Sequence, residues 1–223
     1  MTQDIEFRSG SITLLRALDK SPERVSVHID GRFAFSLHQD VVLEFGLAKG
    51  KSLGVEEQVR MVRQDLVLKA RVLALRYMAY RDRTAAEVRR RLRKTYSEEI
   101  ADEVVGGLRA SGLLDDRAFA EAFAERRFRQ EGHGPVRVRA DLLRKGVAPA
   151  VLEAALDAVF VEQDALADRA VEVGRTWWER LSGEPDPMKR KKKVCDYLVR
   201  RGYPFDLARR VVFDLARETD RQA

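Results

Sequence analysis

Basic side chains are the residues of this sequence whose type and spacing could bind a ligand, and they are densest in residues 83–94. Guanidinium and ammonium groups pair with carboxylates and phosphates, so such a cluster suits an acidic protein surface or a nucleic-acid backbone. Like charges on one helix repel each other, which a structural role alone does not explain. The alternative is a solvated face with no ligand. The cations are Arg89, Arg90, Arg91, Arg93 and Lys94.

The segment that holds these cations is predicted to be a short helix. Thr84 and Glu87 have the spacing of a capping box, in which each side chain bonds the other residue's backbone N–H. Val88 and Leu92 are four residues apart, share one face and are expected to point into a core. Because this apolar stripe is narrow, the helix needs neighbours to stabilise it.

The same pattern occurs three times, with a period of about 50–56 residues. An apolar pair spaced i, i+4 is followed by a basic pair and then by the start of another helix. We therefore predict three tandem three-helix units that pack as an elongated, curved array. The apolar pairs are Val88/Leu92, Val138/Leu142 and Val194/Leu198, and the basic pairs are Arg93/Lys94, Arg144/Lys145 and Arg200/Arg201.

Glycine and proline mark the ends of these helices. Gly146 and Gly202 each follow a basic pair and suit the left-handed cap position. Pro149 and Pro204 are expected in the first turn of the next helix, where a missing N–H is harmless. The first unit has no glycine after Lys94, so its helix is expected to end with a different geometry.

The first helix of each unit is predicted from apolar residues at helical spacing. In addition, a linker helix is expected to start near Val55, with Val59, Val62 and Leu66 on its apolar face. The predicted faces of the three leading helices are Leu68, Val72, Leu75 and Met78; Phe119 and Phe123; and Leu166, Ala170, Val173 and Trp177.

The N-terminal part is predicted to be a small β-sheet. Apolar residues alternate on both sides of Asp30-Gly31, which is a favoured two-residue hairpin turn. Residues 12–37 are therefore predicted to form about three strands, packed on a short helix over Asp40–Phe45. Gly50-Lys51-Ser52 lacks the upstream glycine and strand of a phosphate loop and is interpreted as a turn.

These patterns predict a mainly α-helical protein with an N-terminal β-rich subdomain. The expected domains are 1–54, the β-rich subdomain with its short helix; 55–113, a linker helix and the first three-helix repeat; 114–160, the second repeat; and 161–223, the third repeat.

Composition limits the class of protein. The 223 residues carry a formal net charge of +6, which favours an acidic partner such as nucleic acid, an acidic protein surface or anionic lipid. The single cysteine, Cys195, excludes an internal disulfide and suits a reducing cytosol. The sequence has no apolar run near ~20 residues and no signal-peptide pattern, so we expect a soluble cytoplasmic protein.

The sequence predicts neither catalysis nor a metal or other cofactor. Asp115-Asp116 is interpreted as a helix cap with a dipole partner. His28, His38 and His133 show no metal-ligand spacing with Cys195. Paired carboxylates at helical spacing and a nucleophile–base arrangement are both missing, so a nuclease or other enzyme is not favoured.

Four motifs stand out in the helical part of the sequence: YRDRTAAEV at 80–88, GLLDDRAFA at 112–120, Gly134-Pro135 with LLRKGV at 142–147, and LVRRGY at 198–203. In their order and spacing, these motifs resemble the bacterial RecX family over about residues 60–217. The N-terminal hairpin is similar to an extension of some family members, whereas the missing glycine after Lys94 departs from the family pattern.

The resemblance implies a regulator of the RecA recombinase, not an enzyme. RecX proteins bind the RecA–single-stranded DNA filament, lying in or near its helical groove. They suppress its ATPase, its strand exchange and the co-protease activity that triggers the SOS response. The implied partner is therefore the RecA filament, with a weak direct contact to its single-stranded DNA as a secondary expectation, no membrane partner, and a monomeric protein.

The predicted contacts with RecA acids or DNA phosphates are cations at matching places in the repeats. For the basic pairs, the alternative is a structural role, because cations at a helix C-terminus are favoured by the macrodipole. Lys191 and Lys192 lie at a helix start, where the dipole disfavours them, and this favours a ligand. The set is Arg81, Arg83, Arg89, Arg90, Arg93, Lys94, Arg144, Lys145, Lys191, Lys192, Arg200 and Arg201.

The alternative function is a helix-turn-helix transcription regulator, because short basic helices after tight turns could enter a major groove. Against it, the repeats are tandem in one chain. The basic helices also lack the Asn and Gln that often read bases alongside Arg.

Overall fold

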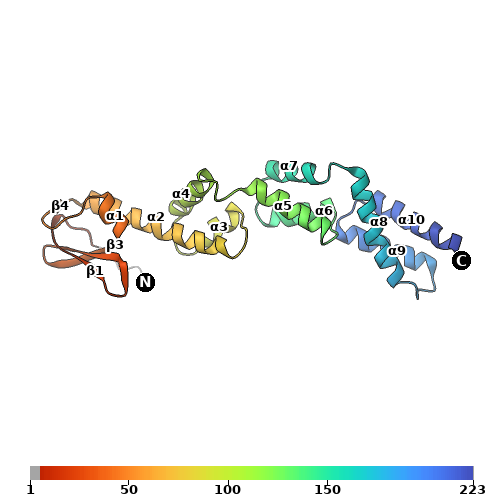
Figure 1. Ribbon diagram of the computed structural model, residues 1–223, viewed down its shortest axis with the longest axis horizontal. Helices are drawn as coiled ribbons and strands as arrows, with labels where there is room; N and C mark the ends of the chain where they lie inside the picture. Colours follow the sequence, from red (N-terminus) through yellow and green to blue (C-terminus); the bar gives the residue numbers. More distant parts are fainter. Residues whose placement is uncertain (1–5, 223) are drawn as a thin grey trace. The chain divides into compact units, whose positions relative to one another are not determined.

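The computed structural model describes residues 6–222, and over this range the chain is mainly α-helical with a small antiparallel sheet near its start (Figure 1). The predicted fold class is confirmed; the curvature of the array of repeats stays a prediction. The described chain forms two compact units. One comprises the residues up to Tyr80 together with Arg89–Gly107, and the other comprises Arg81–Val88 together with the residues from Leu108 onward.

The N-terminal sheet has four antiparallel strands in the order β3-β2-β1-β4. Asp30-Gly31 joins β2 to β3, and both residues have positive φ, 47° and 79°, as a two-residue hairpin turn requires. The predicted hairpin and short helix are therefore confirmed, whereas β4 was not predicted. The elements are β1 (Gly10–Leu18), β2 (Ser21–Ile29), β3 (Arg32–His38), α1 (Gln39–Glu44) and β4 (Ser52–Leu53).

Lys51 lies in a turn, as predicted, and not in a phosphate loop. Its ammonium donates a hydrogen bond to the Phe45 carbonyl at 2.7 Å and pairs with Glu57 at 3.0 Å. The chain enters β4 directly after it. Because both groups neutralise or satisfy the ammonium, this lysine is part of the local fold.

The sheet packs on α2 (Val55–Ala79), a single continuous helix that includes both the predicted linker helix and the leading helix of the first repeat. Figure 1 shows the strands and α1 gathered at the N-terminal end of this helix. Ile12, Val27, Leu37 and Met61 belong to the core between them.

The buried face of α2 differs from the predicted one. Val59, Val72 and Leu75, which were expected in the core, are exposed. Ala70 and Ala74 are buried instead, along with polar residues that find partners. Val62 and Leu68 pack against the core as predicted, but the prediction was wrong for the other three, because the fully buried face of this helix consists of alanine, methionine and satisfied polar side chains.

Asp65 is the polar residue that joins α2 to the sheet. Its carboxylate accepts hydrogen bonds from both Nη atoms of Arg24, at 3.0 and 3.1 Å, and from the backbone N–H of His38 at 2.8 Å. Burial alone would raise the pKa of Asp65, but the bonds from Arg24, Lys69 and His38 outweigh burial and hold the pKa below its ordinary value.

The remaining helices follow in sets of three, as predicted. Each middle helix buries its i, i+4 pair completely, and all six side chains are 0% exposed. The helices are α3 (Ala85–Leu92) and α4 (Glu98–Ala110); α5 (Asp116–Arg129), α6 (Pro135–Arg144) and α7 (Pro149–Val159); and α8 (Gln163–Arg180), α9 (Pro187–Arg201) and α10 (Phe205–Gln222).

Helix starts also follow the sequence closely. Thr84 and Glu87 form the predicted capping box, with reciprocal hydrogen bonds of 3.1 and 3.2 Å. Asp115 caps α5 by accepting from two backbone N–H groups, as predicted. Pro149 is the first residue of α7, whereas Pro204 precedes α10 by one residue and accepts from the Ala208 N–H at 2.9 Å.

The start of α3 lies against the end of α6. Gly146 adopts the left-handed conformation, with φ 77°. A Cβ at this position would overlap the Cβ of Ala86. Alongside, the Thr84 hydroxyl donates to the Lys145 carbonyl at 2.6 Å. The glycine therefore both ends its own helix and leaves room for the start of another.

The start of α6 lies against the end of α9 in the same way. Gly202 has φ 92°, and a Cβ there would overlap the backbone of Arg137. The Gly134 N–H donates to the Arg201 carbonyl at 2.9 Å, and the Val136 N–H donates to the Gly202 carbonyl at 3.1 Å. A middle helix is thus seated on the middle helix of the following repeat.

The missing glycine after α3 now has a physical reason. Residues 93–96 all have negative φ, and the Tyr96 N–H bonds the Leu92 carbonyl at 3.0 Å, so the predicted different ending is confirmed. Within the described chain no three-helix set precedes α3. The end of α3 therefore receives no helix start and has no need of a glycine.

Replacing Gly146 by alanine tests this seat. We expect Gly112→Ala, at φ 69° with open space around it, to cost only the left-handed penalty of about 1–2 kcal/mol. Gly146→Ala should cost more, because its Cβ also meets Ala86. The free energy of unfolding in urea measures both, and Ala86→Gly should recover the excess. An equal cost for Gly112→Ala and Gly146→Ala would contradict the close packing of Gly146 against Ala86.

Candidate functional site

Two of the predicted contact residues in or just after α3 already pair with acids. Arg89 pairs with Asp102, and Arg93 pairs with Glu98 at 3.1 Å. Arg90 and Lys94 are exposed and make no ion pair with any residue that the structure describes. Among the predicted contact residues in or just after α3, these two therefore have a charge that is left for a ligand.

Glu87 brings together two other predicted residues. Arg81 pairs with its carboxylate at 2.8 Å, and Lys145 approaches the same carboxylate at 3.7 Å. Burial would raise the pKa of Glu87, but the hydrogen bonds from Arg81 and Thr84 hold the pKa below its ordinary value. Arg83, in the same turn, is half-buried.

Lys145 is enclosed by its own chain. Its ammonium lies 5.6 Å from the centroid of the Phe119 ring and 5.2 Å from that of Phe123, within cation–π range. With Glu87 also near, the charge is compensated internally. This geometry favours the structural alternative for Lys145 over a contact role.

Arg144 shares a buried acid with two other arginines. Asp141, only 3% exposed, pairs with Arg127 and Arg144 and lies 3.6 Å from Arg137. Burial would raise the pKa of Asp141, but the hydrogen bond and charge of Arg127 outweigh burial and lower it. The Arg144 side chain is 69% exposed, so it can exchange this partner for a ligand at small cost.

The basic run at the start of α9 is divided between fold and surface. Asp186 caps the helix and lies 3.8 Å from Lys189, while Lys193 pairs with Glu184. The Arg190 guanidinium stacks over the Trp178 ring at 4.1 Å. The two residues in the predicted set, Lys191 and Lys192, make no ion pair among the residues that are described.

The basic pair at the end of α9 is divided in the same manner. Arg201 donates to the Glu131 carbonyl at 2.6 Å and lies 5.1 Å from the centroid of the Tyr197 ring. Arg200 is exposed, and no acid of the described chain pairs with it. Arg201 therefore helps to hold the third repeat to the loop that follows α5, and Arg200 is left for a ligand.

The predicted cations that are left for a ligand fall into two groups, one in each compact unit. Arg90 and Lys94 lie in the first unit, whereas Lys191, Lys192 and Arg200 lie in the second. That all of them form one ladder stays a prediction. The sequence analysis did not predict the ion pair between Arg127 of α5 and the buried Asp141 of α6. The only signal for it was the occurrence of an acid and an arginine on neighbouring helices.

The described residues contain no cluster of three or more His, Cys, Asp or Glu placed to hold a metal ion. Over the same part of the chain, every helix is too short or too polar to cross a membrane.

Comparison with known proteins decides the family. Four family models match the chain: the N-terminal domain of regulatory protein RecX over residues 10–54, and the first, second and third three-helix domains of RecX over 70–108, 115–156 and 164–212. The chain belongs to the RecX family. The resemblance predicted from the four sequence motifs is thus confirmed, and RecX proteins are regulatory proteins.

Curated relatives named regulatory protein RecX match over most of their length. The protein of Halalkalibacterium halodurans is 32% identical over 200 residues, which cover 86% of this chain and 73% of that protein. That of Geobacillus kaustophilus is 31% identical over 221 residues, covering 96% and 80%. That of Clostridium acetobutylicum is 28% identical over 199 residues, covering 88% and 92%.

Two solved RecX structures share the fold. A crystal structure of regulatory protein RecX superposes with a TM-score of 0.73 at 24% identity, covering 88% of this chain and 96% of that one. RecX from Lactobacillus salivarius gives a TM-score of 0.62 at 23% identity, covering 69% and 98%. At these identities the likeness supports the architecture of the repeats.

Asp141→Asn tests how far the site is tied to the fold. We expect a loss of about 3 kcal/mol, because Asp141 is buried and the partly buried Arg127 would keep only Glu131 as its acidic partner. Glu121→Gln, which breaks the exposed pair with Arg117, should cost much less, because solvent screens an exposed ion pair. Denaturant unfolding measures both.

The pH dependence of the Asp141→Asn effect follows from the lowered pKa. The carboxylate stabilises the fold above the ordinary carboxyl pKa, and this contribution is lost as the pH falls through the lower folded pKa. The difference between the parent and variant should be constant near neutral pH and shrink below about pH 4. A difference that grew on acidification would contradict the ion pair.

Proposed function

We propose that this protein binds the RecA–single-stranded DNA filament and inhibits the ATPase, strand-exchange and co-protease activities of RecA. The observation that carries the proposal is the RecX family match over all three helical repeats and the N-terminal domain. The protein acts as a monomeric, cytoplasmic regulator of recombination, DNA repair and the SOS response, without catalysis of its own.

Binding rests on the cations that the fold leaves unpaired. Arg90, Lys94, Lys192 and Arg200 gain a partner in the complex and lose none, so each contributes without first breaking an ion pair. Contacts with phosphates release counterions, and contacts with RecA acids are screened by salt. Either way, inhibition weakens as ionic strength rises.

The other predicted residues take different parts. Arg89 is partly exposed, and Arg93 and Arg144 are at least half-exposed. Each of these arginines exchanges an internal acid for one on the filament. Lys145 and Arg201 stabilise the repeats, so we expect their loss to affect inhibition by lowering the stability of the fold.

We also propose the domain limits 1–54, 55–113, 114–160 and 161–223.

The test is ATP hydrolysis by the cognate RecA on single-stranded DNA, with this protein added over a range of ratios and at two salt concentrations. We expect hydrolysis to fall at substoichiometric or near-equal ratios, and less at high salt. An unchanged rate at both salt concentrations would remove the proposal. Tight, sequence-selective binding to duplex DNA without RecA would instead favour the transcription regulator.

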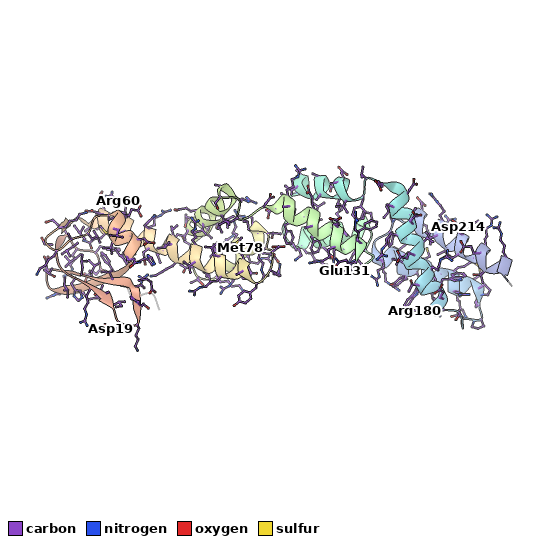
Figure 2. All side chains as sticks on the ribbon, in the orientation of Figure 1. Asp19, Arg60, Met78, Glu131, Arg180 and Asp214 are labelled. Carbon is purple, nitrogen blue, oxygen red and sulfur yellow. The ribbon has the colours of Figure 1, made fainter. Side chains whose placement is uncertain are left out.

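Charge reversal tests the contact residues. Arg90→Glu with Lys94→Glu should raise the concentration needed for half-maximal inhibition about tenfold or more, because two attractive contacts become repulsive. Arg60→Glu with Arg71→Glu is the matched control, since both arginines are exposed and unpaired among the described residues but lie on α2, outside the predicted set (Arg60 is labelled in Figure 2). Equal effects from the two double variants would mean that inhibition depends on the net charge of the protein and not on contacts made by Arg90 and Lys94.

A further inference from the structure

In each of the first two repeats, an ion pair joins the middle helix to the last helix. Arg89 of α3 pairs with Asp102 of α4, and Arg139 of α6 pairs with Glu153 of α7. In each case the arginine directly follows the first buried valine of the middle helix. The two pairs therefore occupy the same place in their repeats.

The third repeat lacks this ion pair. Cys195 of α9 stands at the position of the arginine, and Arg209 of α10 stands at that of the acid. Arg209 makes no ion pair with any described residue, and its guanidinium lies 5.9 Å from the centroid of the Phe205 ring. An interaction that other repeats satisfy internally is left open here.

A second ion pair of the first repeat is replaced as well. Arg93 and Glu98 correspond to Val199 and Phe205, counted from the same buried residues. Both apolar side chains are exposed, and the phenyl ring is 58% exposed. A charged, self-paired face has therefore become an exposed apolar face with an unpaired arginine.

The exposed residues continue along α10 as a stripe. We define the α10 stripe as Phe205, Arg209, Phe213 and Arg217, which are spaced four residues apart and so are neighbours on the helix surface. Phe213 is 59% exposed, and the Arg217 guanidinium lies 5.6 Å from its ring centroid.

The fold of the third repeat does not depend on the stripe. Its core is supplied by the opposite side of α10, from Ala208, Val211 and Leu215, together with residues of α8 and α9. Two large exposed rings on a helix that is already anchored are more simply explained by a ligand than by packing.

Alternating rings and guanidinium groups are suited to single-stranded nucleic acid. Unpaired bases stack on aromatic faces regardless of sequence, and arginines contact the phosphates between them. The two phenylalanines are eight residues apart, or about 12 Å along the helix, so each ring can take its own base. Asp206 and Asp214 flank the stripe (Asp214 is labelled in Figure 2), so stacking should contribute more than net charge.

We propose that the α10 stripe binds single-stranded nucleic acid, with bases stacked on Phe205 and Phe213 and phosphates held by Arg209 and Arg217. The inference rests on the proposed function only for its setting, because the filament is where this protein would meet an unpaired strand. Its test needs no RecA.

The experiment is fluorescence anisotropy of a labelled oligothymidine titrated with the full chain. We expect binding by the parent protein, and a loss of about tenfold or more in affinity for Phe205→Leu with Phe213→Leu, since leucine keeps apolar area but removes the ring. Phe205→Trp with Phe213→Trp should restore the affinity. Phe33→Leu is the matched control, because that ring is 53% exposed on the sheet.

Circular dichroism shows whether each variant is folded. No binding of oligothymidine by the parent, or equal affinity of the leucine variant, would overturn the proposal. A leucine variant that keeps its oligothymidine affinity but loses RecA inhibition would assign the stripe to a protein partner and would overturn it too. Oligothymidine binding through the stripe without any effect on RecA would leave this proposal standing while the proposed function fails.

Discussion

The end of one middle helix, seated against the start of another, is the interaction on which the helical repeats depend. At Gly146 and Gly202 the chain turns into the left-handed conformation, which ends the helix and removes the one side-chain atom that would block the neighbour. The freed carbonyls at these ends then accept from Thr84 and Val136. Glycine at these two positions thus lets a helix end and leaves room for the neighbouring helix start that bonds its carbonyls.

Much of this could be predicted from the sequence, because it depends on local rules. The buried pairs at i, i+4, the capping box at Thr84 and the two glycine caps each follow from short-range geometry. The face of α2 could not be predicted in this way. Asp65 is buried only because Arg24 and the His38 N–H, which are distant in sequence, converge on it. Periodicity shows which residues are apolar, but not which polar residues will find partners.

The candidate site shows the same division. The sequence predicts that cations gather on the middle helices, because it gives their number and spacing directly. Which of them stay available was not, because Asp102, Glu98 and Asp141 neutralise some and leave Arg90, Lys94 and Arg200 exposed. The α10 stripe could be recognised only from the structure, because the ion pairs of the first two repeats show that the third repeat lacks one.

Amide hydrogen exchange at the start of α6 tests the seating of the helices most directly. The first N–H groups of a helix have no partner within it and normally exchange rapidly. Here the N–H groups of Gly134 and Val136 donate to the end of α9, so they should be protected nearly as well as the N–H of Val138 inside the helix. Rapid exchange at Gly134 and Val136, with Val138 still protected, would contradict the account.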